Sequence, residues 1–184
     1  RDNGNSNYGT AIVGTVSGTS ISFGSAVVFN SAETDASSAT FDSTNGKVVI
    51  AYQDKGNNSY GTAIVGTVSG TSISFGSEVV FESAFSRFFS TTFDSTNGKV
   101  VIAYQDYGNS SRGTAIVGTV SGTSISFGSH VIFNSGGETV EIAATYDSTN
   151  QKVVIVYSDA SNSDYGTAIV GTVSGTSISF GSAV

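Results

Sequence analysis

The chain has 184 residues and a formal net charge of −7, from 7 Lys and Arg against 14 Asp and Glu. This charge argues against a nucleic-acid partner, because phosphate binding needs a basic patch. No apolar run approaches the roughly 20 residues that span a bilayer, and there is no Cys for disulfides or zinc–thiolate sites. We therefore expect no nucleic acid, no membrane insertion, and no metal or other cofactor.

A repeated phrase organises the sequence. The phrase YGTAIVGTVSGTSISFGS occurs three times intact and once with only its first letter changed. Its copies begin at Tyr8, Tyr60, Arg112 and Tyr165. A second block, of the type ATFDSTNGKVVIAYQD, recurs with the same spacing from Ala39, Thr91 and Ala144. Such self-similarity predicts a repeat architecture with a unit of about 52 residues.

Each unit is expected to contain four strands, which we name A, B, C and D in chain order. In the unit at 30–81 they cover 38–42, 47–54, 61–68 and 73–81. Strands A and B are joined by STNG, a hairpin signal in which Asn45 and Gly46 tolerate positive φ, and strands C and D are joined by SGTS. No window has the 3.6-residue period of a helix. The pattern predicts an antiparallel meander.

The whole chain is a single array of three and a half units. A half unit at 1–29, with strands C and D alone, is followed by units at 30–81, 82–133 and 134–184. Since half a unit cannot close a ring, we expect part of a longer chain or a homo-oligomer. Two such chains would sum to seven units, and strand exchange between chains would instead build a filament.

Strand B indicates how the units pack. Its core, VVIAY, is apolar on both faces, so both faces must be buried, and no helix is expected to cover them. Four-stranded sheets stacked face to face, with a repeat near 50 residues, describe a β-propeller, with strands A and B toward the middle and C and D toward the rim. A β-solenoid or an open stack of sheets is the alternative. A β-sandwich would not need such close repetition.

Nearly all differences between units lie on one predicted face. In the meander, the A–B and C–D turns share one edge and hardly vary, whereas the B–C loops and D–A connections share the other edge and differ in every copy. A constant scaffold with one variable loop face is typical of binding modules. Neutral drift in tolerant loops is the competing interpretation.

The D–A connection FSRFF supplies the first candidate ligand-binding residues, Arg87 and Phe88. An exposed aromatic ring beside Arg could form a stacking platform for a sugar or a partner. The alternative is that Phe88 or Phe89 extends strand A into the core.

The B–C loops supply the other candidates. An acidic residue closes each strand B and could bind a sugar hydroxyl or Ca²⁺ together with a loop Asn such as Asn57, although an Asx turn is the more ordinary role. These acidic residues are Asp54, Asp106 and Asp159. Tyr107 follows one of them. The variable first position of the repeated phrase holds Tyr60, Arg112 and Tyr165, which could stack on sugars or cover the sheet edge.

Catalytic groups are few. His130 is the only His, and its counterparts in the other copies are Ala26, Glu78 and Ala183. That interchange indicates an exposed strand position rather than a base oriented by a partner. Glu138 and Glu141 lie in one loop, but their spacing does not establish glycosidase geometry. We expect no catalytic residues and no enzyme, unless a site is completed by residues outside this segment.

The phrase GTAIVGTVSGTSISFGS following GKVVIAYQD resembles tandem repeats in structural or tail-fibre-like proteins of marine bacteriophages and in surface proteins of marine microbes. The resemblance covers essentially the whole chain, and it transfers no catalytic residues. It implies a place on a virion or cell exterior, with a role in adhesion or structure. A polar surface of Ser, Thr, Asn and Gly, with only 11% charged residues, suits that location.

We therefore expect a non-enzymatic, lectin-like module that recognises glycans or a cell-surface receptor through its variable loops, several weak sites acting together. The alternative is a structural repeat protein that builds a fibre or multimer by strand exchange.

Overall fold

The protein is all-β, with 68% of its residues in strands and 5% in helix. The computed structural model describes residues 2–184. The first part of the chain forms β1 (Tyr8–Ala11), β2 (Gly14–Ser17), β3 (Ser20–Phe23), β4 (Val27–Asp42), β5 (Lys47–Asp54), β6 (Tyr60–Ser69) and β7 (Ser72–Phe75). The middle forms β8 (Val79–Asp94), β9 (Lys99–Asp106), β10 (Arg112–Ser121), β11 (Ser124–Phe127) and β12 (Val131–Asn134). The last part forms β13 (Thr139–Asp147), β14 (Lys152–Asp159), β15 (Tyr165–Ser174) and β16 (Ser177–Phe180).

Helical residues form short 3₁₀ turns between strands B and C of each unit. These turns are η1 (Lys55–Asn57), η2 (Tyr107–Asn109) and η3 (Ala160–Asn162). Among the described residues, no helix has the length and apolarity needed to cross a membrane.

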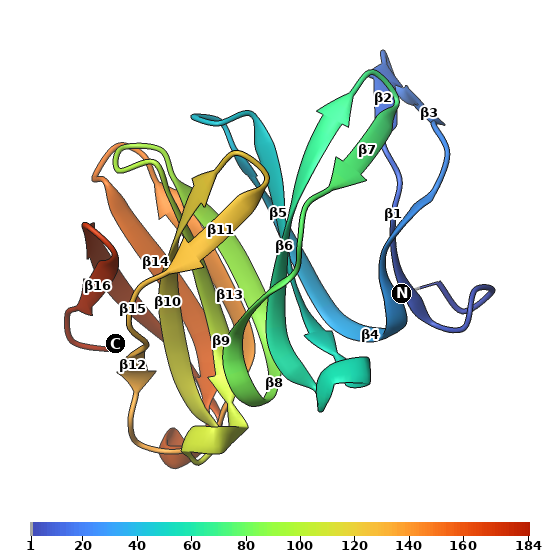
Figure 1. The fold of residues 1–184 in the computed structure, drawn as a ribbon. Coiled ribbons are helices and arrows are strands. Elements are labelled where there is room, and N and C mark those ends of the chain that lie inside the picture. Colours follow the sequence, from blue (N-terminus) through green and yellow to red (C-terminus); the bar gives the residue numbers. More distant parts are fainter. Residues whose placement is uncertain (1) are drawn as a thin grey trace.

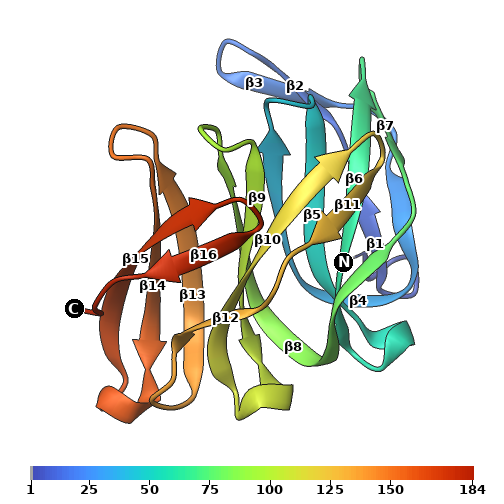
Figure 2. The same cartoon turned by 60° about the vertical axis from the view of Figure 1, so that its left-hand side comes forward.

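The predicted meander is confirmed. Strand A pairs with B, B with C, and C with D, always antiparallel, in unit 1 (residues 34–75), unit 2 (86–127) and unit 3 (139–180). A half unit (2–23) precedes them and contains strands C and D. The units stand side by side in Figure 2, and none of the sheets closes on itself.

The two expected sets of loops lie at opposite edges of the sheets. The turns β2–β3, β4–β5 and β6–β7 lie along the top of Figure 1, whereas the 3₁₀ turns of the B–C loops lie along the bottom. In the A–B hairpin, the Asp42 carboxylate accepts hydrogen bonds from the backbone N–H groups of Thr44 and Asn45, at 2.9 and 3.0 Å. The left-handed conformation expected for both turn residues occurs at Gly46 alone, with φ 64°.

Two element boundaries differ from the expectation. Strand D is not one continuous strand: β7 ends at Phe75, and the chain resumes pairing with β6 only from Val79, in β8. The same strand β8 then continues into strand A of unit 2, as β4 does for unit 1. The cause is that each long strand pairs first with one meander and then with the next, so it crosses the expected boundary between units.

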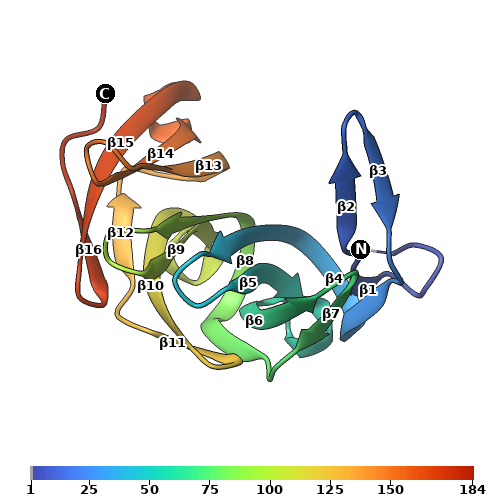
Figure 3. The same cartoon turned by 90° about the horizontal axis from the view of Figure 1, so that it is seen from above.

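Strand B is buried on both faces in the middle of the array, as its sequence predicts. In unit 2, Ile102 and Tyr104 face unit 1, while Val101 and Ala103 face unit 3, and all four are fully buried. The units therefore form one continuous stack of sheets. Seen from above in Figure 3, this stack follows an arc, with β4, β8 and β13 on its inner side and β7, β11 and β16 on its outer side.

Polar contacts between neighbouring units repeat along the stack. The Ser38 hydroxyl oxygen accepts the backbone N–H of Thr91 at 3.0 Å, and Ser90 does the same for Ala144 at 2.8 Å. From strand B, the Gln53 side-chain amide donates to the carbonyl of Ser86 at 2.8 Å. Gln105 donates likewise to the carbonyl of Thr139 at 2.8 Å. These bonds satisfy buried backbone groups and fix the register of one unit on the next.

Candidate functional site

Each strand A contains a β-bulge at the same position. The pairing with strand B shifts by one residue between Asp35 and Ser38, between Arg87 and Ser90, and between Val140 and Ala143. The residue inside each bulge has a left-handed conformation: φ is 45° at Ala36, 54° at Phe88 and 53° at Glu141. Left-handed backbone is costly for residues other than Gly, and such strain is concentrated at functional sites.

The strain can be measured at the bulge of unit 1. Ala36→Gly should raise the free energy of unfolding by about 0.5–1 kcal/mol, because Gly adopts positive φ without the clash of a Cβ atom. Ala39→Gly is the matched control: Ala39 is also an exposed residue of the same strand, but in regular pairing, and there Gly should be destabilising by about 0.5–1 kcal/mol. Urea unfolding of both variants measures the difference. Equal losses would show that Ala36 is not strained.

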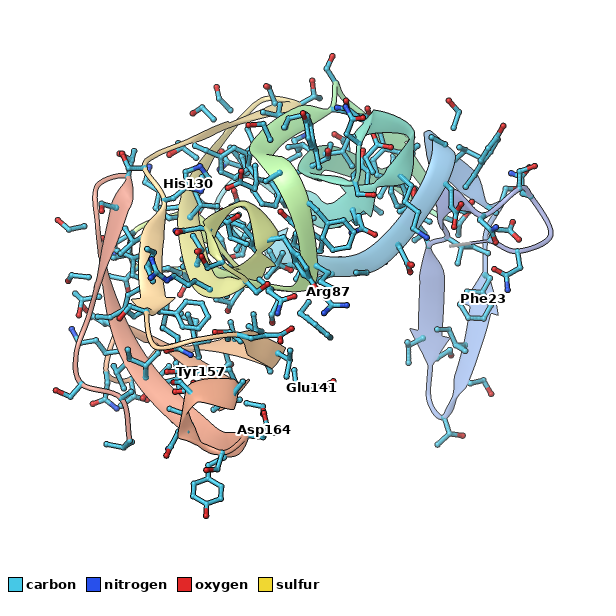
Figure 4. All side chains as sticks on the ribbon, turned by 90° about the horizontal axis from the view of Figure 1, so that it is seen from below. Phe23, Arg87, His130, Glu141, Tyr157 and Asp164 are labelled. Atoms are coloured by element: carbon cyan, nitrogen blue, oxygen red, sulfur yellow. The ribbon has the colours of Figure 1, made fainter. Side chains whose placement is uncertain are left out.

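The three bulges converge on one cleft. This cleft has a volume of about 690 Å³, and most of its lining comes from β4, β8 and β13, the strands on the inner side of the arc in Figure 3. It is lined by Asp35, Ala36, Ser37, Gln53, Lys55, Phe85, Arg87, Phe88, Phe89, Glu141, Ile142 and Ala143. In Figure 4, Arg87 and Glu141 point into the concave centre from β8 and β13. The cleft is therefore built from variable residues that three units hold in equivalent places.

Arg87 has contacts with both aromatic and polar groups around the cleft. Its guanidinium carbon lies 4.7 Å from the centre of the Phe88 ring and 5.0 Å from that of Tyr107. Its Nε donates to Gln105 Oε1 at 2.7 Å, and its Nη2 lies 3.5 Å from a carboxylate oxygen of Glu138. Two aromatic faces and two polar anchors hold the cation in one orientation, which lowers the entropy cost of using it for recognition.

The opposite wall carries a second ion pair. Lys55 Nζ lies 2.9 Å from Glu33 Oε1 and 3.4 Å from Asp35 Oδ2. The hydrogen bond to Glu33 raises the pKa of Lys55 above its ordinary value, so the side chain remains a cation at neutral pH. With Glu138 and Glu141, the carboxylates around the cleft outnumber its two cations. The site therefore has no excess positive charge to attract an anionic ligand.

Aromatic faces flank the cleft on the side of unit 2. Phe85 and Tyr107 pack edge to face with ring centres 4.6 Å apart, and they are 40% and 41% exposed. Phe88 is half-buried, whereas Phe89 is buried among the side chains between units 1 and 2. Both Phe residues line the cleft, and each also packs on a core cluster: Phe89 on the one between units 1 and 2, and Phe88 on the one between units 2 and 3.

The acidic residues that end strand B have a structural setting. Asp54 is 5% exposed and accepts the backbone N–H of Gly56 at 3.0 Å, as a cap of η1, and the side-chain amide of Asn30 at 3.0 Å. Asp159 caps η3 through Ser161 in the same way. Burial alone would raise the pKa of Asp159, but hydrogen bonds from Ser161 and Asn134 outweigh it and hold the pKa below its ordinary value.

Asp106 occupies the same place in unit 2 with a different environment. It is 7% exposed, and its Oδ1 has no hydrogen-bond partner among the described residues. The position of Asn30 is held in this unit by Glu82, which offers no amide donor to Asp106. No group of three or more His, Cys, Asp or Glu side chains suited to a metal ion occurs within residues 2–184.

The remaining candidates from the sequence lie outside the cleft lining. Tyr60 and Arg112 begin strand C and are half-buried, and Arg112 donates to Asn109 Oδ1 at 3.4 Å. Tyr165, at the same position in unit 3, is 66% exposed. Asn57 ends η1 and is half-buried. Of the predicted residues, the structure therefore brings together Arg87, Phe88 and Tyr107.

His130 is exposed, as the sequence predicts, but it lies in a connection rather than in a strand and it has side-chain partners. His130 lies between β11 and β12, and its Nδ1 is 2.6 Å from the hydroxyl of Tyr104, which also donates to Glu82 Oε2 at 3.2 Å. Burial, aided by the charge of Glu82, raises the pKa of the Tyr104 phenol far above its ordinary value. This group lies away from the cleft, on the other side of unit 2 in Figure 4.

No protein-family model, curated protein or solved structure matches this chain.

Proposed function

We propose that the chain is a non-enzymatic binding module that recognises a neutral saccharide in the cleft between its three bulges. The observation that carries the proposal is the convergence of Phe88, Arg87 and Glu141, from two different units, on one concave surface. We place the module on the exterior of a cell or virion, where its polar, weakly charged surface is suited to solvent.

The proposal includes a propeller-type architecture. The arc of sheets, the inner position of β4, β8 and β13 and the outer position of β7, β11 and β16 support it (Figure 3). In a propeller the inner strands surround the axis, and ligands bind where their variable residues meet. The cleft is at that place relative to the stack.

The chemistry of the cleft fits a polyol better than an anion. Sugar hydroxyls can accept from Arg87 and the Gln53 amide and can donate to the carboxylates of Asp35 and Glu141, all of which line the cleft. The apolar face of a sugar ring can stack on Phe88 or Phe85. Because carboxylates outnumber cations here, a sulfated or sialylated glycan would meet repulsion.

Arg87→Ala tests this site. We expect the variant to weaken binding of neutral oligosaccharides at least about tenfold, because it removes a charge-assisted donor and leaves the Phe88 and Tyr107 rings without the guanidinium that packs on them. A glycan array identifies the ligand, and titration calorimetry measures the affinity. Arg112→Ala, which removes the same charge outside the cleft, should bind as the wild type does.

The outcomes separate the proposal from its alternatives. Equal weakening by both variants would indicate a general charge effect and would contradict a site at the cleft. Affinity that falls steeply with salt would contradict a neutral ligand. Turnover of a bound polysaccharide would contradict the non-enzymatic assignment.

A second candidate is a structural role in a fibre or multimer. One observation favours it, on the face of unit 3 that no further unit covers. There Val156 and Val170 are each 45% exposed. Their counterparts in unit 2, Ala103 and Val117, are fully buried against unit 3. An exposed face that matches a buried interface is suited to self-assembly. A native mass that rises with protein concentration would support this role.

A further inference from the structure

The same phrase folds in two ways within this chain. In the three full units, strand C is one strand of ten residues, as in β6 (Tyr60–Ser69). In the half unit the identical residues form two short strands, β1 and β2, which Ile12 and Val13 separate. Because the sequence is the same, the difference must come from the surroundings.

The missing neighbour is strand B. In unit 1, residues 60–66 pair with residues 54–48 of β5 along their whole length. In the half unit, β1 pairs with β4 on one edge, and on the other edge the described residues show only the single bridge between Asp2 and Tyr8. Beyond that bridge, the edge from Gly9 to Gly14 offers backbone groups in the position where strand B would bind.

A hollow lies beside this open edge. It has a volume of about 410 Å³ and lies between the half unit and the side of unit 1 that faces the half unit. Its lining is mostly apolar and comes from both sides: Thr10, Ala11, Ile12, Val13, Phe29, Ser37, Ser38, Ala39, Val48, Ile50, Val68 and Ile73.

The next junction along the stack shows what fills this space when strand B is present. Between units 1 and 2, the residues equivalent to Val48 and Ile50 are Val100 and Ile102, which are fully buried. They are covered by Val49 and Ala51, which strand B of unit 1 contributes to the same cluster.

At the open junction Val48 is half-buried and Ile50 is 6% exposed, so the contrast between occupied and open junctions is larger at strand A. Phe93 in unit 2 packs against the cluster between units 1 and 2, and Tyr146 in unit 3 donates a hydrogen bond of 2.6 Å to Thr96 in the A–B turn of unit 2. Their counterpart Phe41 is 56% exposed. An aromatic ring that is packed at two junctions is therefore bare at the third.

We propose that this hollow and the open edge of the half unit are a docking site for a β-hairpin with the A–B sequence of this repeat. Strand B of the hairpin would pair with Gly9–Gly14 and would place its Val–Ala pair over Val48 and Ile50, as Val49 and Ala51 do for unit 2. Its strand A would bring a Ser to the backbone N–H of Ala39, as Ser38 does for Thr91. This site does not depend on the saccharide cleft.

A labelled peptide with the sequence of residues 34–54, added to the full chain, tests the proposal. We expect saturable binding, and we expect slowed hydrogen exchange at the alternate amides of Thr10–Gly14 that point to the open edge, since strand addition gives them carbonyl partners. A control peptide that carries Val49→Asp and Ala51→Asp should bind about tenfold more weakly or not at all, because its carboxylates would enter the hollow unpaired. Phe41→Ala in the chain should weaken binding about tenfold while leaving the fold intact, because that ring is exposed.

Three results would overturn the proposal. The first is no binding at peptide concentrations up to about 1 mM, a limit that corresponds to roughly 4 kcal/mol of affinity. The second is equal binding of the control peptide. The third is a stable dimer of the 184-residue chain in which these edge amides are already protected and the peptide does not bind, since the face of a second folded copy, rather than an A–B hairpin, would then be the occupant.

Discussion

Replacing Gly76 by Ala should lower the free energy of unfolding by about 3 kcal/mol, near the upper end of the usual cost of overpacking. A Cβ atom at this position would lie 1.9 Å from the backbone carbonyl oxygen of Thr123, in the C–D turn of unit 2. A main-chain carbonyl cannot move aside without displacing the turn. Gly128 meets Thr176 of unit 3 in the same way, at 1.8 Å, so Gly128→Ala should have a similar effect.

Gly181→Ala is the matched control. Gly181 occupies the same position of the repeated phrase in unit 3, but there the heavy atom nearest to an added Cβ would be the carbonyl oxygen of Val170, at 3.8 Å. This variant should change stability by less than about 0.5 kcal/mol. Urea unfolding followed by circular dichroism compares the three variants. A loss at Gly181 as large as that at Gly76 would assign the glycine to the local turn rather than to packing between units.

The invariance of the repeated phrase follows from this packing. Units 1 and 2 each meet the next unit through a glycine of the phrase under a neighbouring carbonyl, and through a buried strand B and Ser and Gln hydrogen bonds that lie outside the phrase. A residue in the phrase therefore has to suit both its own unit and the following one. Because neighbouring units have nearly the same sequence, the packing requirements are the same at each junction between full units.

The sequence predicts the class of fold and the order of strands well, because these depend on local patterns. The period-2 and two-sided apolar patterns identify strand B, and STNG identifies the A–B hairpin. The division of strand D at residues 76–78 was not predictable, since it depends on a long strand pairing with two meanders in turn. The break between β1 and β2 at Ile12 and Val13 was not predictable either, since the identical residues of the full units form an unbroken strand.

The candidate site was predicted only in part. Arg87 and Phe88 stood out as an unusual aromatic and basic group in a variable connection, and both line the cleft. Asp35 and Glu141 were missed as site residues, because their importance comes from the bulge that places equivalent positions of three units around one space. The equivalent positions 36, 88 and 141 hold different residues in the three units, and this difference was the signal available in the sequence. Without knowledge of the bulge, it shows only that the position varies.

Val117→Asp should be the most damaging substitution on the strand faces, with a loss of several kcal/mol. Val117 is fully buried between units 2 and 3, and a carboxylate there would be desolvated without a partner. Since a domain of this size has roughly 5–15 kcal/mol of stability, we expect a large unfolded fraction or loss of unit 3 from the stack. Thermal unfolding and hydrogen exchange distinguish these results, because the second would leave units 1 and 2 protected.

Val170→Asp places the same charge at the equivalent position of unit 3, where the side chain is 45% exposed. A chain that works as a monomeric module should tolerate it, with a change in stability below about 0.5 kcal/mol and an unchanged native mass. If this uncovered face of unit 3 is an assembly surface, the variant should instead be a folded monomer, whereas the wild-type chain forms an oligomer. The pair of variants thus separates packing within the chain from packing between chains, because Val117 responds only to the first and Val170 only to the second.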